Sequence, residues 1–386
     1  MFFSFLALFS IKYGGAENSS IYIIYNTLNF LIIFFINFYT SIKTGFYKNE
    51  IYIYLFIFIL LAIQFLFYLS NTDDLYFLTF ISYFILLGLP GLFASLVLIK
   101  NQLFTLFIKY TDIISLLIVL AIFKSLSFSY IISGEIDTAI AGTDYQFLSY
   151  LCALSYGIII YNSYNLNQDL RFNFFKSNFF KKITPLLIFI CILGAILGAG
   201  RGAFLLIIIY TFSVFILNVK NRKLVYIYIL SICILILLLF YYLSFNEDSI
   251  FNRFGRIFSY INGDSIIDIE NGSSGRDKLY QVAIDAILKS PIFGYGPFSV
   301  WSTVGMPHNI ILEIFLQYGI FAIFILFLVI YIILRNRNTY NILHYKWIKN
   351  LALFPLIMLL FSASYMHVAI FWFVLGYLFS KNLLHE

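Results

Sequence analysis

The stretch GAILGAGRGAFLL, residues 194–206, decides the fold, because it joins two apolar runs through a single arginine. The two runs, 184–199 and 202–219, are each close to the length of about 20 residues that crosses a bilayer. Glycines flank Arg201 on both sides, and glycine permits a tight turn with accessible backbone. The sequence therefore predicts a hairpin of two transmembrane helices with a guanidinium at the turn.

The composition of the whole chain extends this pattern. Hydrophobic residues make up 62% of the 386 residues, charged residues only 11%, and the mean hydropathy is +0.94. A water-soluble domain would carry about 25% charged residues, so the composition excludes one and predicts an all-α, polytopic transmembrane helix bundle. The net charge of +6 is spread over short loops between apolar runs, which argues against a nucleic-acid-binding patch.

Eleven apolar runs are long enough to be predicted as spans, and residues 1–12 form a twelfth if they cross the membrane. The predicted spans are 21–40, 51–70, 75–99, 110–132, 147–166, 184–199, 202–219, 224–244, 308–334, 348–364 and 367–381. No low-complexity linker divides the chain. We therefore expect a single transmembrane domain, residues 1–386, with residues 245–307 inserted between spans as one large periplasmic loop.

The connections between the predicted spans alternate in charge. Every second one is rich in lysine and arginine: 43–48, 100–109, 171–182, 220–223 and 335–349. Because positively charged loops remain in the cytoplasm, these connections and the C-terminus are expected inside. The turn at Arg201 and the 245–307 loop, with five basic and seven acidic residues, are then expected outside.

Arg201 is an arginine on the outer side, where the distribution of loop charges does not call for one. The planar guanidinium binds phosphate oxygens in bidentate fashion, so Arg201 is predicted to bind a lipid-linked diphosphate. The alternative is an arginine that extends to the lipid headgroups.

The predicted external loop contributes Arg253, Arg256 and Arg276. Residues 275–290 carry apolar side chains at helical spacing and predict a short amphipathic helix on the membrane surface or on the spans. Arg276 would lie in its first turn, which is unfavourable for a cation in the helix dipole. An anionic partner is therefore expected, either a substrate diphosphate or Asp277.

His308 opens the next apolar run directly after a proline. An imidazole exchanges a proton near neutral pH, and a helix N-terminus favours a nearby phosphate. Glu313 follows more than one turn into the predicted span, where a carboxylate faces a cavity or a partner, and Gln317 shares its face. His367 precedes the last span on the outer side and is a further candidate for the site.

Lys124 lies inside an apolar run, and an ionisable residue within a membrane is a functional candidate, unless it extends toward the outer surface. A glycan-lipid flippase or another transporter would place charges along many spans. The other polar groups gather at one face, which favours an enzyme. The external loop has no paired aspartates of the DxD kind, so neither a metal ion nor another cofactor is expected.

Three segments together resemble the O-antigen polymerase/ligase superfamily of bacterial inner-membrane glycosyltransferases. They are GAGRGAFLL (198–206), GRDKLYQVAIDAILKSPIFGYGP (275–297) and PHNIILEIFLQYGIFA (307–322). The ligase signature has a histidine, then Asn, Ser or Gln, nine residues and a glycine, and His308, Asn309 and Gly319 match it. Its last position is Gly, Thr or Tyr in the family and Ala322 here.

The resemblance implies a GT-C-like bundle of 11–12 spans and an inverting, metal-independent transfer of a glycan from undecaprenyl diphosphate. A Wzy-type O-antigen polymerase passes the growing glycan to the non-reducing end of the next lipid-linked repeat unit. An O-antigen ligase passes it to lipid A–core. Size, composition and the imperfect ligase signature favour the polymerase.

The resemblance also implies the roles of individual residues. Arg201 and Arg276 would bind the diphosphate, and His308 would act at the acceptor hydroxyl. Arg253 and Arg256 of the predicted external loop are our own further candidates for diphosphate binding, outside the three resembling segments. The predicted catalytic residues are His308, Arg201 and Glu313, and Lys124, Asn309 and His367 are further candidates.

The expected partners are an undecaprenyl-diphosphate-linked oligosaccharide, membrane lipids and a chain-length regulator protein, with no nucleic acid. The expected location is the bacterial inner membrane, crossed several times, with the site facing the periplasm. The expected biological role is in polysaccharide and lipopolysaccharide biosynthesis.

Overall fold

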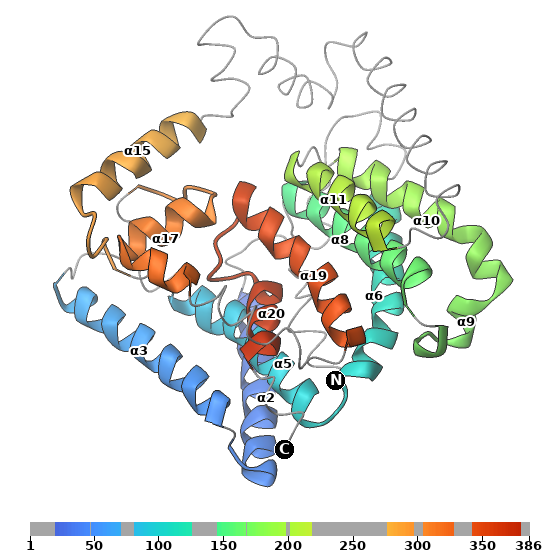
Figure 1. The fold of residues 1–386 in the computed structure, drawn as a ribbon, viewed down its shortest axis with the longest axis horizontal. Helices are drawn as coiled ribbons and strands as arrows, with labels where there is room; N and C mark the ends of the chain where they lie inside the picture. Colours follow the sequence, from blue (N-terminus) through green and yellow to red (C-terminus); the bar gives the residue numbers. More distant parts are fainter. Residues whose placement is uncertain are drawn as a thin grey trace, which may run out of the picture.

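The computed structural model describes residues 20–46, 48–70, 81–125, 145–166, 168–197, 201–217, 276–296, 304–327 and 342–379. Its labelled helices are α2 (Ser20–Thr44), α3 (Lys48–Ser70), the π-helix η1 (Phe84–Gly88), α5 (Leu89–Lys100), α6 (Phe104–Ser125), α8 (Tyr145–Tyr164), η2 (Gln168–Leu170), α9 (Asn173–Lys176), α10 (Asn178–Leu197), α11 (Arg201–Leu217), α15 (Arg276–Lys289), α17 (Ile310–Tyr318), α19 (Ile342–Phe361) and α20 (Ala369–Phe379) (Figure 1). These ranges contain no β-strand, so the predicted all-α class is confirmed.

Several of the described helices are apolar enough to cross a membrane. Three of them are also long enough: Ile23–Thr44, Ile81–Lys100 and Asn178–Ala195. Shorter apolar helices cover Glu50–Ile59, Gly202–Val214 and Ala369–Phe379. The described part of the chain is therefore consistent with a helical membrane protein, while the predicted span 224–244 and residues 1–12 lie outside it.

The core is built around α8, which packs against α6, α10, α11 and α19, while α20 packs against α5. Small residues permit these close approaches, as is usual between membrane helices. A side chain on Gly91 of α5 would collide with the backbone of Ala369 in α20, and one on Gly376 of α20 would collide with Ser95 of α5. These glycines bring the two helix backbones into contact.

Helix α19 connects two different ends of the bundle. In its first turn, the Nε2 atom of His344 lies 2.9 Å from the hydroxyl of Thr105 at the start of α6. At its last residue, Phe361 is in contact distance of Gly202 at the start of α11: a Cβ on Gly202 would lie 3.2 Å from the Cβ of Phe361. The starts of α6 and α11 therefore lie at opposite ends.

Described parts of four of the lysine- and arginine-rich connections, with neighbouring residues, meet at the His344 end, which we call the basic end (residues 43–46, 48–50, 100–112, 165–166, 168–177 and 342–349). Asn101 reaches Thr40 across this end at 3.5 Å. Arg171 binds the carboxylate of Asp112 through Nε at 2.9 Å and Nη2 at 3.2 Å. These contacts place the four segments at one end of the helices.

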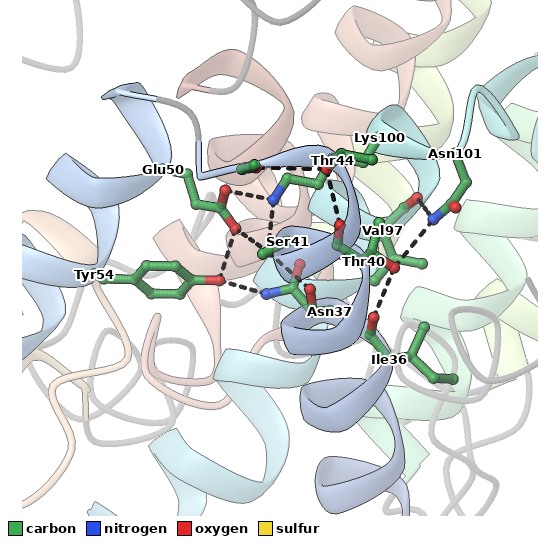
Figure 2. A network of polar contacts seen from close by, with 11 residues as sticks. Ile36, Asn37, Thr40, Ser41, Thr44, Glu50, Tyr54, Val97, Lys100 and Asn101 are labelled. Carbon is green, nitrogen blue, oxygen red and sulfur yellow. Dashed lines mark hydrogen bonds and ion pairs between the residues drawn. The ribbon is translucent and has the colours of Figure 1, made fainter.

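A polar network of α2, α3 and α5 stabilises the basic end (Figure 2). Lys100 forms a buried ion pair with Glu50 and donates a hydrogen bond to Ser41 at 2.6 Å. Ser41 and Tyr54 each donate a hydroxyl hydrogen bond to the same carboxylate, at 2.7 and 2.9 Å. Because every charged group here has a partner inside the protein, the network joins three helices without an uncompensated charge.

The apolar run predicted as the span 308–334 is not one continuous helix in its described part, and helix does not begin directly after Pro307. Helix α17 begins at Ile310, ends at Tyr318 and is followed by a turn at Gly319, with φ +54°, before helix resumes at residues 321–327. An apolar run does not reveal this interruption, because it depends on contacts with another segment.

Residues 291–296 provide those contacts at the end of α17. The amides of Tyr295 and Gly296 donate to the carbonyls of Leu316 and Gln317 at 2.9 and 3.0 Å. The amide of Ile320 donates to the carbonyl of Pro291 at 2.8 Å. Terminal carbonyls of a helix need partners of this kind, so α17 can end inside the apolar run.

Candidate functional site

The first turn of α11 is packed tightly at the end of the bundle opposite the basic end, which we call the site end. Gly202 is buried, and a side chain there would collide with the hydroxyl of Tyr150 in α8. The same position lies against Phe361 at the end of α19. Glycine is therefore required beside Arg201 for close packing, a reason that the sequence did not reveal.

Arg276 is the first residue of α15, which confirms the predicted amphipathic helix over 275–290. Its side chain is partly exposed and interacts electrostatically with the phenol of Tyr150. The start of α11 lies against the same phenol. Tyr150 therefore interacts both with Arg276 of α15 and with the helix that begins with Arg201. The alternative partner Asp277 is exposed, and no ion pair between described residues joins it to Arg276.

Helix α15 packs against α17, and the two lie side by side in Figure 1. Leu279, one turn after Arg276, approaches to 4.0 Å from the position of a Cβ on Gly305. Gly305 precedes His308 by three residues. Arg276 and His308 therefore lie on two segments that contact each other.

His308 is partly buried and has a left-handed backbone, with φ +52°. A residue with a side chain rarely adopts this conformation, which costs about 1–3 kcal/mol and is often found at functional sites. His308 lies just before α17, not inside it.

Asn309 is the N-cap of α17. Its Oδ1 accepts hydrogen bonds from the amides of Ile311 and Leu312, at 2.9 and 3.3 Å. These bonds satisfy two of the amides that the expected phosphate at this helix end would use. The structure therefore gives the side-chain oxygen of Asn309 a capping role.

Glu313 lies in α17 with 1% of its surface exposed. Its carboxylate accepts a hydrogen bond from the hydroxyl of Ser364 and a longer one, 3.4 Å, from Nε2 of Gln317. Gln317 in turn accepts a hydrogen bond from the hydroxyl of Tyr365 at 2.6 Å. The expectation that Glu313 faces a partner is confirmed, and that partner belongs to the protein.

Ser364 and Tyr365 belong to residues 362–368, which connect α19 to α20 and which we call the α19–α20 turn. Nε1 of Trp372 donates to the carbonyl of Tyr365 at 2.8 Å. His367 packs edge-on against Tyr83, with ring centroids 6.2 Å apart. His367 therefore lies in the turn that contacts Glu313, although its ring packs against Tyr83.

The π-helix η1 also reaches the α19–α20 turn. A side chain on Gly88 would collide with the carbonyl of Met366 and would lie 3.0 Å from the ring of Trp372. Single π-helical turns often occur near functional sites. The turn is therefore held between α17, η1 and α20.

Several predicted residues cannot be placed in this arrangement. Arg253 and Arg256 lie outside the described residues, as do the side chains of Arg201 and Lys124. In the described ranges, no group of three or more His, Cys, Asp or Glu side chains is arranged to hold a metal ion.

Three residues at the site end carried no useful signal in the sequence. Tyr150 is one of 31 tyrosines, whereas Ser364 and Tyr365 stand in the short polar stretch FSASYMH, 361–367, between two apolar runs.

Asp112 is a further charge inside a predicted span besides Lys124. Its pairing with Arg171 at the basic end gives it a structural explanation.

A comparison with protein families identifies this region. A family model described as O-antigen ligase matches residues 186–327, which are 142 of the 386 residues. The match includes Arg201, Arg276, His308 and Glu313. No curated protein and no solved structure matches the chain. The resemblance to the O-antigen polymerase/ligase superfamily is thus confirmed over residues 186–327.

Proposed function

We propose that this protein is an inner-membrane glycosyltransferase that transfers a glycan from undecaprenyl diphosphate to an acceptor hydroxyl at the site end. One observation carries the proposal. The start of α11 lies against Tyr150, which interacts with Arg276 at the start of α15, and Leu279 of α15 approaches Gly305, three residues before His308. Arg201 begins α11, Arg276 begins α15, and His308 lies two residues before the start of α17.

Arg201 and Arg276 bind the diphosphate in this proposal, and Arg253 and Arg256 assist them. The diphosphate gains negative charge as its bond to the anomeric carbon breaks. Fixed guanidinium groups in a site with little water stabilise such charge strongly. Each arginine also forms two parallel hydrogen bonds with phosphate oxygens, which orients the leaving group.

His308 acts on the acceptor. The acceptor oxygen attacks the anomeric carbon from the side opposite the diphosphate, so the configuration inverts. The new carbon–oxygen bond forms as the bond to the diphosphate breaks, and the proton of the acceptor hydroxyl passes to the imidazole. A histidine is suited to this step because its usual pKa is near neutral pH.

The polymerase reaction is our first choice, since Ala322 departs from the ligase signature. In that reaction the acceptor is the non-reducing end of another lipid-linked repeat unit, and a chain-length regulator protein is an expected partner. The description of the matching family as O-antigen ligase favours the second candidate, transfer to lipid A–core. The basic end is proposed to face the cytoplasm, which places the site in the periplasm.

The proposal is tested by replacing Arg201 or His308 with alanine. We expect each variant to insert normally in the membrane, because neither change removes apolar surface, and to produce no polymer. The measurement is the glycan ladder on a gel, with the amount of protein in the membrane fraction measured in parallel. His344→Ala is a matched control at the basic end and should keep the ladder; ladders in both site variants would refute these roles.

Complementation separates the candidate reactions. The wild-type gene should restore ladders in polymerase-null cells if it encodes a polymerase, or attachment to lipid A–core in ligase-null cells if it encodes a ligase. Rescue of flippase-null cells alone would point to a transporter and would contradict the proposed transferase.

A further inference from the structure

We infer that Ser364 and Tyr365 are positioning residues, which hold α17 in place through Glu313 and Gln317 and thereby set the position of His308. This inference rests on the proposed function. It also changes the role expected for Glu313, from a group that acts on the substrate to an anchor for the helix.

The burial of the two α17 side chains is the first argument. Glu313 is 1% exposed and Gln317 is fully buried, so neither presents a surface to a sugar or a diphosphate. They are four residues apart and lie on one face of α17. Each accepts one hydroxyl hydrogen bond from the α19–α20 turn, Glu313 from Ser364 and Gln317 from Tyr365.

The shortness of α17 is the second argument. It has nine residues and ends at Tyr318, directly before Gly319. Isolated helices of this length are marginal in stability. Its orientation must therefore be fixed by contacts with other segments. The turn at 291–296 holds its last carbonyls, and the two hydroxyl hydrogen bonds hold the face between its ends.

The rigidity of the α19–α20 turn is the third argument. Trp372 binds the carbonyl of Tyr365, and the amide of Met366 donates to the hydroxyl of Ser364 at 3.3 Å. Ala363 adopts a left-handed backbone, with φ +57°. A turn constrained in this way is a fixed support, and α17 takes its position from it.

The consequence for the reaction follows from the position of His308, five residues before Glu313. A displacement of about 1 Å in a reacting group lowers the rate by about 100-fold. Loss of one hydroxyl should displace α17 by less than about 1 Å, so the rate should fall by less than about 100-fold. The diphosphate-binding arginines begin α11 and α15, so the affinity for the donor should change less than the rate.

The experiment uses the full-length protein in nanodiscs with Ser364→Ala and Tyr365→Phe. The chain provides matched controls, Ser41→Ala and Tyr54→Phe, which remove the same atoms from hydroxyls that donate to the buried carboxylate of Glu50 at the basic end. One readout is amide hydrogen exchange in residues 310–318. The other is kcat and KM with undecaprenyl-diphosphate-linked repeat unit as the probe.

In the two site-end variants, we expect faster exchange in α17, a kcat lowered about 10-fold and a KM within about twofold of wild type. The two controls should leave both readouts unchanged. Unchanged exchange in α17 would overturn the inference, and so would faster exchange without loss of kcat. An equal loss of kcat in the controls would mean that the effect is one of general stability.

Glu313 supplies the decisive second test. Glu313→Gln keeps an acceptor oxygen for Ser364, so kcat should stay within about threefold of wild type, whereas Glu313→Ala should lose about 10-fold or more. An equal loss in both would show that the carboxylate itself is needed, against a positioning role. If the wild-type protein transfers no glycan, the proposed function fails; if it does and the serine and tyrosine variants match it, only this inference fails.

Discussion

Two buried carboxylates, Glu50 at the basic end and Glu313 at the site end, have similar surroundings and one decisive difference. Both are almost fully buried, and both accept a hydrogen bond from a serine hydroxyl. Glu50 is also paired with the ammonium group of Lys100. Glu313 forms no ion pair within the described residues, where the buried pairs both lie at the basic end.

The arginines of the two ends differ in the same way. Arg171 is buried and is paired with the carboxylate of Asp112 through two hydrogen bonds. Arg276 is partly exposed, and none of the described carboxylates forms an ion pair with it. The protein therefore uses its own carboxylates to neutralise two buried cations of the basic end, Lys100 and Arg171. At the site end, a cation remains accessible to an anionic ligand, as binding of a diphosphate requires.

The largest effect should come from breaking the ion pair at the basic end. Glu50→Ala leaves the buried ammonium group of Lys100 without its negatively charged partner, which should cost about 3–5 kcal/mol of folding free energy. Thermal unfolding of the purified protein, with the folded yield, measures this loss. Glu50→Ala combined with Lys100→Met should recover part of it, and an unchanged unfolding midpoint in Glu50→Ala would show that the pair is not structural.

The second prediction compares the two arginines. Arg276→Ala should fold normally and lose about 100- to 1,000-fold in kcat, the usual effect of removing one group that stabilises developing charge. Arg171→Ala should instead reduce the folded yield, and the folded fraction should keep a normal turnover. Turnover per folded molecule, measured for both variants, decides the matter: a normal rate in Arg276→Ala would remove the diphosphate role.

The third prediction concerns two glycines with positive φ. A Cβ on Gly319 would lie 2.5 Å from the carbonyl oxygen of Ile292, whereas one on Gly45, at the basic end, would meet no atom within 4 Å. Both alanine variants carry backbone strain of about 1–3 kcal/mol, but only Gly319→Ala also disturbs the contact between 291–296 and α17. We expect activity per folded molecule to fall in Gly319→Ala and to persist in Gly45→Ala; equal activities would contradict the importance of that contact.

The smallest effect should come from His344, which precedes the predicted span 348–364. Burial lowers the pKa of its imidazole below the usual 6.5, so just below about pH 6.5 the folded protein binds fewer protons at this site than the unfolded chain does. Its contribution to stability is therefore present above that pH and is lost as the pH falls. Unfolding midpoints between pH 7.5 and 5.5 should fall less steeply in His344→Gln, and identical slopes would contradict this assignment.

The sequence predicted the fold class because hydropathy over 20 residues is a local property. It also predicted α8 over 147–166, which the structure has at Tyr145–Tyr164. The end of α17 inside the apolar run could not be predicted from the sequence, because the turn at Gly319 depends on hydrogen bonds from the separate segment 291–296. The pair of Glu50 and Lys100 was missed for the same reason, since partners on different helices are not marked in either helix.

The residues of the candidate site were likewise predicted only in part from the sequence. Arg201, Arg276 and His308 were predicted, because a rare charged residue in an apolar chain is conspicuous and their motifs resemble a family. Ser364 and Tyr365 were not, because hydroxyl side chains are common and only their contacts with Glu313 and Gln317 distinguish them.

Glycan transfer at the site end is tested most directly by following the release of undecaprenyl diphosphate from an undecaprenyl-diphosphate-linked repeat unit. The measurement uses the purified protein in nanodiscs, with and without lipid A–core. The wild-type protein and His344→Ala should release the diphosphate lipid at similar rates, and His308→Ala should release none. Release by His308→Ala at the wild-type rate, or no release by the wild-type protein with either acceptor, would contradict transfer at the site end.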